Sequence, residues 1–144
     1  MTLYLIATIA GQRVALAAAP IESAVEIAAI TPVPRAPPHV AGLAALRSRV
    51  LTIVDCTCSL ALGRHPAETR GRAVIVTVDA HQYGLLVDDV LDAVTITEPP
   101  RPAPLALAPG WAKATAGVVE HDGALLLLLD PAQLVDGPPE RAAA

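Results

Sequence analysis

The sequence predicts an all-β fold, a small barrel or sandwich, and three observations support this. Short segments rich in Val, Ile, Leu and Thr follow one another with turn residues at close intervals, which is typical of such folds. Few segments show the spacing of apolar residues that an amphipathic helix requires. All 14 prolines lie outside the segments that we assign to strands, as strand pairing demands.

The N-terminal part predicts a hairpin, a helical turn, a strand and an exposed connection. Residues 3–9 are rich in β-branched and aromatic residues, and residues 14–17 return beside them after a turn. Residues 20–24 are expected to form one helical turn, because proline is favoured near a helix start. Residues 25–30 alternate as a strand, and the four prolines of residues 31–38 make an extended surface connection.

The next part of the chain predicts a short helix, one strand and a loop. We expect the helix within residues 40–46 and a short apolar strand at residues 50–54. Residues 56–62 are expected to continue as strand. Residues 64–72 are polar and contain Gly and Pro, so they predict a loop.

Three strands and a long connection follow. Residues 74–78 are the clearest strand, and residues 83–87 return beside them after a turn. Residues 91–96 form another strand by alternation. Residues 99–109 contain five prolines and predict a long exposed connection. We expect Trp111, beside it, to close a barrel end, with the anchoring of a partner as the alternative.

The last strands are predicted by the turn Asp122-Gly123, a strong signal for a type I′ hairpin. This turn separates residues 117–120 from residues 124–129. The five consecutive leucines at 125–129 indicate a central strand that is buried on both faces.

A short helix is expected to follow this hairpin. Asp130 is its predicted N-cap, with Pro131 at the first helical position and Gln133 as the capping-box partner. The helix should end near Gly137, and residues 138–144 should form a disordered tail.

Composition limits the class of protein. The net charge of −4 argues against nucleic acid as the main partner. Mean hydropathy is high at +0.52, but no apolar run reaches the ~18 residues needed to span a membrane. Arg13 interrupts the apolar N-terminal stretch, which lacks the charges of a signal peptide. We therefore expect a cytoplasmic protein that is not inserted in a membrane, with a core of Val, Leu, Ile and Ala.

Motifs that would indicate catalysis are missing. No serine lies in G-x-S-x-G, and no glycine-rich segment matches a phosphate-binding loop. The four histidines are scattered, and the two cysteines lack the spacing of a zinc site. We therefore expect no metal and no cofactor. The enzymatic alternative would need a polar cluster drawn from His39, His65, His81, Asp55, Cys56 and Cys58.

Charge is distributed unevenly along the chain. Residues 35–72 are rich in arginine, whereas residues 79–98 contain acidic residues and neither Lys nor Arg. We favour mutual neutralisation of these two regions in the fold. The alternative is a bipolar surface that meets two partners.

Motifs spread over residues 3–135 occur in an order that identifies a family. They comprise the opening hairpin at 4–16, Val25-Glu26-Ile27, residues 31–37, residues 42–55, residues 83–90 and the closing residues 117–134. Residues 42–50, followed by apolar residues and Asp55, are similar to a G-x-x-N-L-R-G motif. Residues 83–90 are similar to G-L-x-V-D-x-V. Taken together, they resemble the CheW-like family of bacterial chemotaxis scaffold proteins.

This resemblance implies both a fold and a function. The implied fold is a single CheW-like domain over residues 1–137, made of two intertwined, packed, five-stranded SH3-like barrels with short helices. The implied function is that of a non-catalytic adaptor. Such an adaptor couples the cytoplasmic tips of methyl-accepting chemoreceptors to a CheA-type histidine kinase. It pairs barrel against barrel with the kinase's own CheW-like regulatory domain.

Three departures from the family pattern leave a second function open. Ala45 stands where the family has Asn, Ser48 where it has Gly, and Thr52 where it has Pro. Glycine would permit a positive φ at the turn, which serine resists. The alternative is therefore a CheW-like module that regulates another signalling kinase outside classical chemotaxis.

Two arginines inside the apolar run of residues 42–55 point to the partner-binding site. A guanidinium is costly to bury without a partner, so we expect the run to turn at Arg47. Arg47 would then face a carboxylate of a binding partner. The alternative is an internal salt bridge to Asp55. Glu26 is the second candidate, as the exposed charge of an otherwise apolar strand.

Apolar contacts are expected to supply most of the affinity, with charges setting register and rate. The predicted partner-binding residues are Arg47, Glu26, Val40, Leu43, Leu46 and Asp55.

Overall fold

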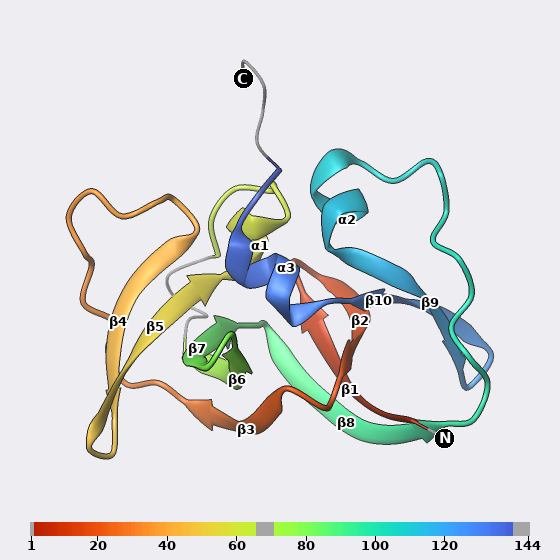
Figure 1. Cartoon of the computed structure of the whole chain (residues 1–144), viewed down its shortest axis with the longest axis horizontal. Coiled ribbons are helices and arrows are strands. Elements are labelled where there is room, and N and C mark those ends of the chain that lie inside the picture. Colours follow the sequence, from red (N-terminus) through yellow and green to blue (C-terminus); the bar gives the residue numbers. More distant parts are fainter. Residues whose placement is uncertain (1, 66–70, 140–144) are drawn as a thin grey trace.

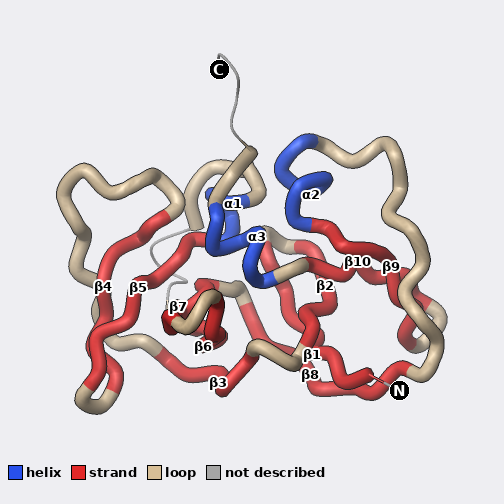
Figure 2. Tube along the Cα trace, viewed as in Figure 1, coloured by secondary structure: helices blue, strands red, loops and turns tan. Residues whose placement is uncertain are grey.

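The computed structural model describes residues 2–65 and 71–139, and this part of the chain contains ten strands and three short helices (Figures 1 and 2). The strands are β1 (Thr2–Ile9), β2 (Gln12–Ala17), β3 (Ile21–Glu26), β4 (Val40–Leu46), β5 (Arg49–Asp55), β6 (Arg72–Val78), β7 (His81–Leu86), β8 (Asp89–Ile96), β9 (Thr115–His121) and β10 (Ala124–Leu129). The helices are α1 (Cys56–Ser59), α2 (Pro109–Ala114) and α3 (Pro131–Asp136).

The strands form two five-stranded sheets built on the same plan. Sheet A has the order β8-β1-β2-β10-β9, and sheet B has the order β3-β6-β7-β5-β4. In each sheet two antiparallel hairpins meet through a parallel pair, β2 with β10 or β7 with β5. The fifth strand is exchanged, since β3 follows β2 but pairs with β6, and β8 follows β7 but pairs with β1. The predicted all-β fold with two five-stranded units is confirmed.

Each proline-rich connection pairs with an outer strand through one isolated antiparallel β-bridge. Thr31, on the chain that leaves β3, exchanges two backbone hydrogen bonds of 2.8 Å with Leu43 of β4. Arg101, on the chain that leaves β8, makes the corresponding bridge to Val118 of β9. The bridges occupy backbone groups on β4 and β9, which are outer strands of sheet B and sheet A, and so limit the exposure of these groups.

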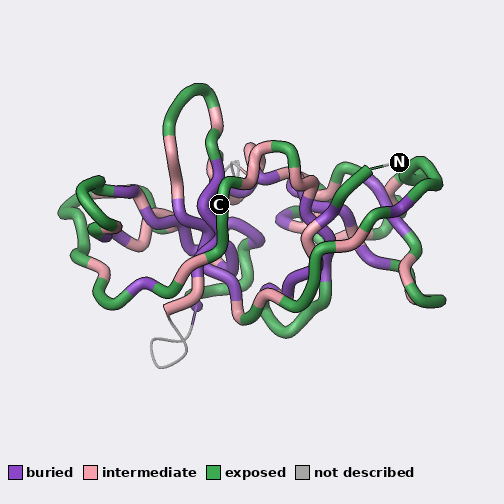
Figure 3. The backbone as a smooth tube through the Cα atoms, turned by 90° about the horizontal axis from the view of Figure 1, so that it is seen from below, coloured by how far each residue is buried: buried purple, intermediate pink, exposed green. Residues whose placement is uncertain are grey.

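The core has a central cluster shared by both sheets. It brings Leu16 and Leu129 of sheet A against Val54 and Leu85 of sheet B, all of them buried. Two further clusters lie within the individual sheets. The predicted core of Val, Leu, Ile and Ala is confirmed, with Tyr4 as an aromatic addition. In Figure 3 the buried segments run through the middle of the molecule, with exposed loops around them.

Four local predictions were wrong. The strand expected at residues 25–30 is displaced, because β3 spans Ile21–Glu26 and residues 27–30 are not strand. In the other three cases pairing or capping outweighs local preference. Residues 20–24 are not a helical turn, because β3 starts at Ile21 and pairs with β6. Residues 40–46 are not a helix but the strand β4, paired with β5. Residues 56–62 do not continue as strand, because the Asp55 side chain caps α1 at its N-terminus.

The predicted C-terminal hairpin is confirmed, but one leucine is not buried. Asp122 and Gly123 both have positive φ, 53° and 76°, as a type I′ turn requires. β10 is central in sheet A, yet Leu125 near its start is 61% exposed. The expectation that this strand is buried on both faces is therefore wrong at its outer end.

The predicted helix start at Asp130 is confirmed, whereas the capping box is not. The Asp130 side chain accepts a hydrogen bond of 3.0 Å from Ala132 N. The Asp130 N–H donates to Ala114 O at 2.9 Å, so it is not available to Gln133. This bond ties the start of α3 to the end of α2.

Two further expectations concern the regions around the helices. Trp111 lies in α2 and packs, half-buried, against the central cluster. Pro138 and Pro139 are described, whereas residues 140–144 and part of the loop expected at 64–72 lie outside the described residues. In residues 2–65 and 71–139, no helix has the length and apolar character needed to cross a membrane.

Candidate partner-binding surface

The β4–β5 hairpin carries two exposed apolar side chains and several of the predicted site residues. Leu43 lies opposite Thr52, and Ala45 lies opposite Val50, so these side chains share the outer face of the hairpin. Leu43 is 37% exposed and Val50 is 69% exposed. Val50 was not among the predicted contacts, although its alternation with Leu51 places it on this face.

Arg47 and Ser48 form the two-residue tip of this hairpin, as the predicted turn requires. The positive φ of 59° falls on Arg47, and Ser48 is not among the residues with positive φ. The replacement of glycine by serine therefore places no strain on the tip. An arginine in this region of φ costs about 1 kcal/mol, which the paired strands offset.

The two arginines that interrupt the apolar run have different environments. Arg49 donates from Nη1 to Gln82 Oε1 on β7, within the protein. Across residues 2–65 and 71–139, Arg47 makes neither a hydrogen bond nor an ion pair, and it is exposed. The Arg47 guanidinium is therefore the charge on this hairpin that remains available to a partner.

Asp55 does not pair with Arg47, and it does not lie on the surface. It ends β5, at the opposite end of the strand from the tip, and it is 2% exposed. Its Oδ1 accepts from Cys58 N at 3.2 Å, and its Oδ2 accepts from His65 N at 2.9 Å. The expectation that Asp55 belongs to the contact set is corrected, because its carboxylate is occupied with buried backbone groups.

The three predicted apolar contacts lie in different environments. Leu43 is on the exposed face beside Val50. Leu46 is half-buried and packs against the interior cluster of sheet B. Val40 is half-buried at the other end of β4 and lines a small cavity under the proline-rich connection. The structure therefore leaves Leu43 and Arg47 exposed on the same hairpin. Leu46 precedes Arg47 but packs toward the interior of sheet B, and Val40 lies at the far end of β4.

Glu26, the second predicted contact, lies at a separate surface where the chain passes between the barrels. Its carboxylate is 80% exposed and lies 3.2 Å from Arg72 Nη2. The same guanidinium contacts Asp89 at 3.3 Å, at the first residue of β8. Arg72 thus joins the outer strands β3 and β8, and its pair with Asp89 is part of the charge neutralisation expected between the two regions.

The polar residues of the enzymatic alternative are only partly brought together. His65 is buried beside Asp55, and its Nδ1 lies 3.5 Å from Asp88 Oδ1. His39 instead contacts Val135 O, and His81 contacts Asp79 O.

The cysteines are poorly suited to nucleophilic chemistry. Burial raises the pKa of the Cys56 thiol far above its usual value, and burial also raises the pKa of Cys58. Protonated thiols are weak nucleophiles and poor metal ligands. Within the described ranges 2–65 and 71–139, no group of three or more His, Cys, Asp or Glu side chains is placed to hold a metal ion.

These observations define a class of protein, a double β-barrel that presents an exposed, charged hairpin and a second charged surface between its barrels. The sequence model of the CheW-like domain matches residues 3–138. The chain therefore belongs to the CheW-like family.

Two curated relatives are both named "Chemotaxis protein CheW". The protein from Rhizobium meliloti is 31% identical over 101 residues, which cover 69% of this chain and 65% of the relative. The protein from Thermotoga maritima is 30% identical over 116 residues, which cover 81% of this chain and 76% of the relative. The match thus spans slightly less than two thirds of the length of the first relative.

A solved structure has the same fold. The scaffolding protein TtCheW from Thermoanaerobacter tengcongensis superposes with a TM-score of 0.77 at 19% identity, covering 89% of this chain and 88% of that protein. At this identity the likeness supports the fold alone.

Proposed function

We propose that this chain is a chemotaxis adaptor that couples chemoreceptor tips to a CheA-type histidine kinase in the cytoplasm, without catalysis of its own. Membership of the CheW-like family supports this role. The curated relatives carry the name of a chemotaxis protein, and the structural neighbour is described as a scaffolding protein.

The observation that carries the proposal is Arg47 at the exposed hairpin tip, with no internal partner in the described chain and with exposed Leu43 and Val50 on the same hairpin. A guanidinium next to exposed apolar side chains is a common composition for a contact that dominates binding energy. We assign this surface to the kinase's CheW-like regulatory domain. Glu26 and Arg72, between the barrels, are assigned to the receptor tip.

Co-sedimentation with receptor signalling fragments, with and without the kinase, tests the proposal. We expect co-pelleting that weakens as salt is added, because exposed charges are screened. We also expect kinase activity to rise when receptor, kinase and adaptor are all present. Absence of binding to both partners by a well-folded protein would refute the adaptor role.

Variants at the hairpin tip then separate binding from stability. Arg47→Ala should weaken kinase binding while the melting temperature stays within about 2 °C, since an exposed side chain without a partner contributes little to stability. Arg13→Ala, an exposed arginine on β2 of the other sheet, is the matched control and should leave binding unchanged. Kinase binding without receptor binding would instead favour a module that regulates another signalling kinase.

A further inference from the structure

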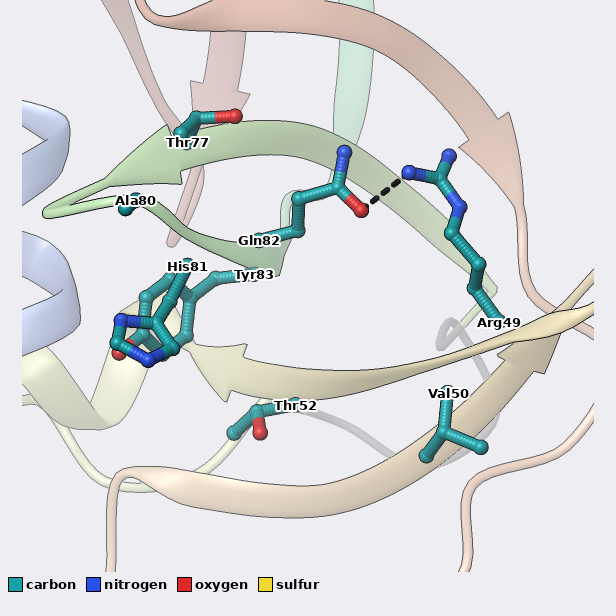
Figure 4. A pocket seen from close by; sticks show the side chains of 8 residues that line it. All are labelled: Arg49, Val50, Thr52, Thr77, Ala80, His81, Gln82 and Tyr83. Atoms are coloured by element: carbon teal, nitrogen blue, oxygen red, sulfur yellow. Dashed lines mark hydrogen bonds between the residues drawn. The ribbon is translucent and has the colours of Figure 1, made fainter.

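The β4–β5 hairpin extends beyond the rest of sheet B. β5 pairs with β7 only from Thr52 to Asp55, whereas the preceding residues, from Arg49, pair with β4 alone. Figure 1 shows this hairpin projecting from the end of the molecule. An open groove of about 670 Å³ lies where β5 and β7 separate. Val50 lies on one side of it, and His81 and Tyr83 lie on the other (Figure 4).

A chain of polar side chains crosses this groove. Arg49 Nη1 donates to Gln82 Oε1, and Gln82 Nε2 donates to Glu22 Oε2 at 2.6 Å. Glu22 Oε2 also accepts from Thr77 Oγ1 at 2.6 Å. The chain therefore links β5 to β7, β3 and β6, and Figure 4 shows its first bond, from Arg49 to Gln82.

Gln82 has a fixed orientation in this chain. Its oxygen faces the Arg49 guanidinium and its amide nitrogen faces the Glu22 carboxylate, so a flipped amide would place donor against donor and acceptor against acceptor. The hydrogen bonds from Thr77 and then Gln82 lower the pKa of Glu22, which keeps the acceptor ionised. Gln82 is the one member that contacts both Arg49 and Glu22.

We infer that Gln82 is a positioning residue that braces the β4–β5 hairpin and sets the orientation of Arg47, Leu43 and Val50 toward the binding partner. This inference rests on the proposed function of the hairpin. A two-stranded hairpin is marginally stable on its own, so the overhanging part needs a contact with the rest of the sheet. A surface held in its bound geometry binds more tightly, because less conformational freedom is lost on association.

The test uses Gln82→Met, which keeps an unbranched side chain of similar length and removes both hydrogen bonds. Gln12→Met is the matched control, an exposed glutamine at the start of β2 in the other sheet. The first readout is hydrogen–deuterium exchange of residues 43–50 in the free protein. We expect faster exchange there in Gln82→Met, no change in the control, and melting temperatures alike for both variants.

The second readout is the affinity for the kinase's CheW-like domain. Loss of the brace should raise Kd about threefold to tenfold, the range expected when one or two side chains must be ordered on binding. Arg49→Met, alone and combined with Gln82→Met, completes a double-mutant cycle. The two substitutions should be non-additive because each breaks the same bond.

The outcomes separate this inference from the function on which it rests. Unchanged hydrogen–deuterium exchange in residues 43–50 of Gln82→Met would overturn the bracing role of Gln82, whether or not the protein binds the kinase domain. Faster exchange with an unchanged Kd would also overturn the positioning role. Failure of the unmodified protein to bind the kinase domain would overturn the proposed function, and with it the role of the brace in binding. Hydrogen–deuterium exchange in the free protein would, even then, show whether Gln82 stabilises the hairpin.

Discussion

Substitution of Asp55 by alanine tests whether this residue belongs to the contact surface or to the frame of the protein. The Asp55 carboxylate is buried and accepts two backbone hydrogen bonds, one from the N-terminus of α1 and one from His65 N. Loss of an N-cap costs about 1 kcal/mol. A buried N–H left without its acceptor costs about 1–3 kcal/mol more. The expected total is about 2–4 kcal/mol.

Asp130 provides a matched comparison because it occupies the corresponding place in the other half of the molecule. It follows the second strand of a hairpin and caps α3, but it is only half-buried and caps through a single bond, to Ala132 N. Asp130→Ala should therefore cost about 1 kcal/mol, the value of the cap alone. The difference between the two variants reports the contribution of the buried bond to His65 N.

Thermal and urea unfolding measure both variants. For a chain of this size 1 kcal/mol shifts the melting temperature by about 3 °C, so Asp55→Ala should melt about 6–12 °C lower and Asp130→Ala about 3 °C lower. At temperatures where Asp55→Ala is folded, its affinity for the kinase domain should equal that of the unmodified protein. A small loss of stability in Asp55→Ala, together with weaker binding, would contradict the structural role and restore Asp55 to the contact set.

Three further predictions concern turns, acid stability and thiols. Ala80 has a φ of 67° in the β6–β7 turn, so Ala80→Gly should raise the free energy of unfolding by about 0.5–1 kcal/mol in urea titrations, and a loss would contradict the strain argument. Hydrogen bonding and the charge of Lys113 lower the pKa of Asp136, so this pair should stabilise the fold above about pH 4 and lose its effect as the pH falls further. Because Asp136 is exposed, the effect should stay below about 1 kcal/mol, and Lys113→Met should abolish this part of the pH dependence. With a thiol reagent at neutral pH, Cys58 should react slowly and Cys56 only after unfolding; rapid reaction of Cys56 in the native protein would contradict its burial.

The sequence predicted those elements whose signals lie within a few neighbouring residues. Asp122-Gly123 defines a turn by its own backbone preferences, and Asp130-Pro131 defines a helix start in the same way. Arg47 was placed at a turn because a charge interrupts an apolar run, which is also a local signal. These predictions held because the local preference and the final fold agree.

The errors occur where contacts between distant residues decide the structure. Ile21 begins a strand because it pairs with Val76, a residue that no local pattern connects to it. The exchange of β3 and β8 between the sheets is of the same kind. Gln82 was not among the predicted residues, because its hydrogen bonds are made with Arg49 and Glu22, which lie far away in the sequence. Asp55 was placed among the contact residues because a charged residue at the end of a strand gives no local signal that its side chain is buried.

The two halves of the molecule share a plan and differ in charge at corresponding positions. The tip of the β4–β5 hairpin is Arg47-Ser48, and the tip of the β9–β10 hairpin is Asp122-Gly123. The second residues of β5 and β10, Val50 and Leu125, are both large, apolar and strongly exposed. Exposed apolar surface at both tips provides contact area, and the opposite signs of the tip charges would help to distinguish one partner surface from another. A carboxylate that attracts Arg47 would be repelled by Asp122, so we expect the two hairpin tips to favour partner surfaces of opposite charge.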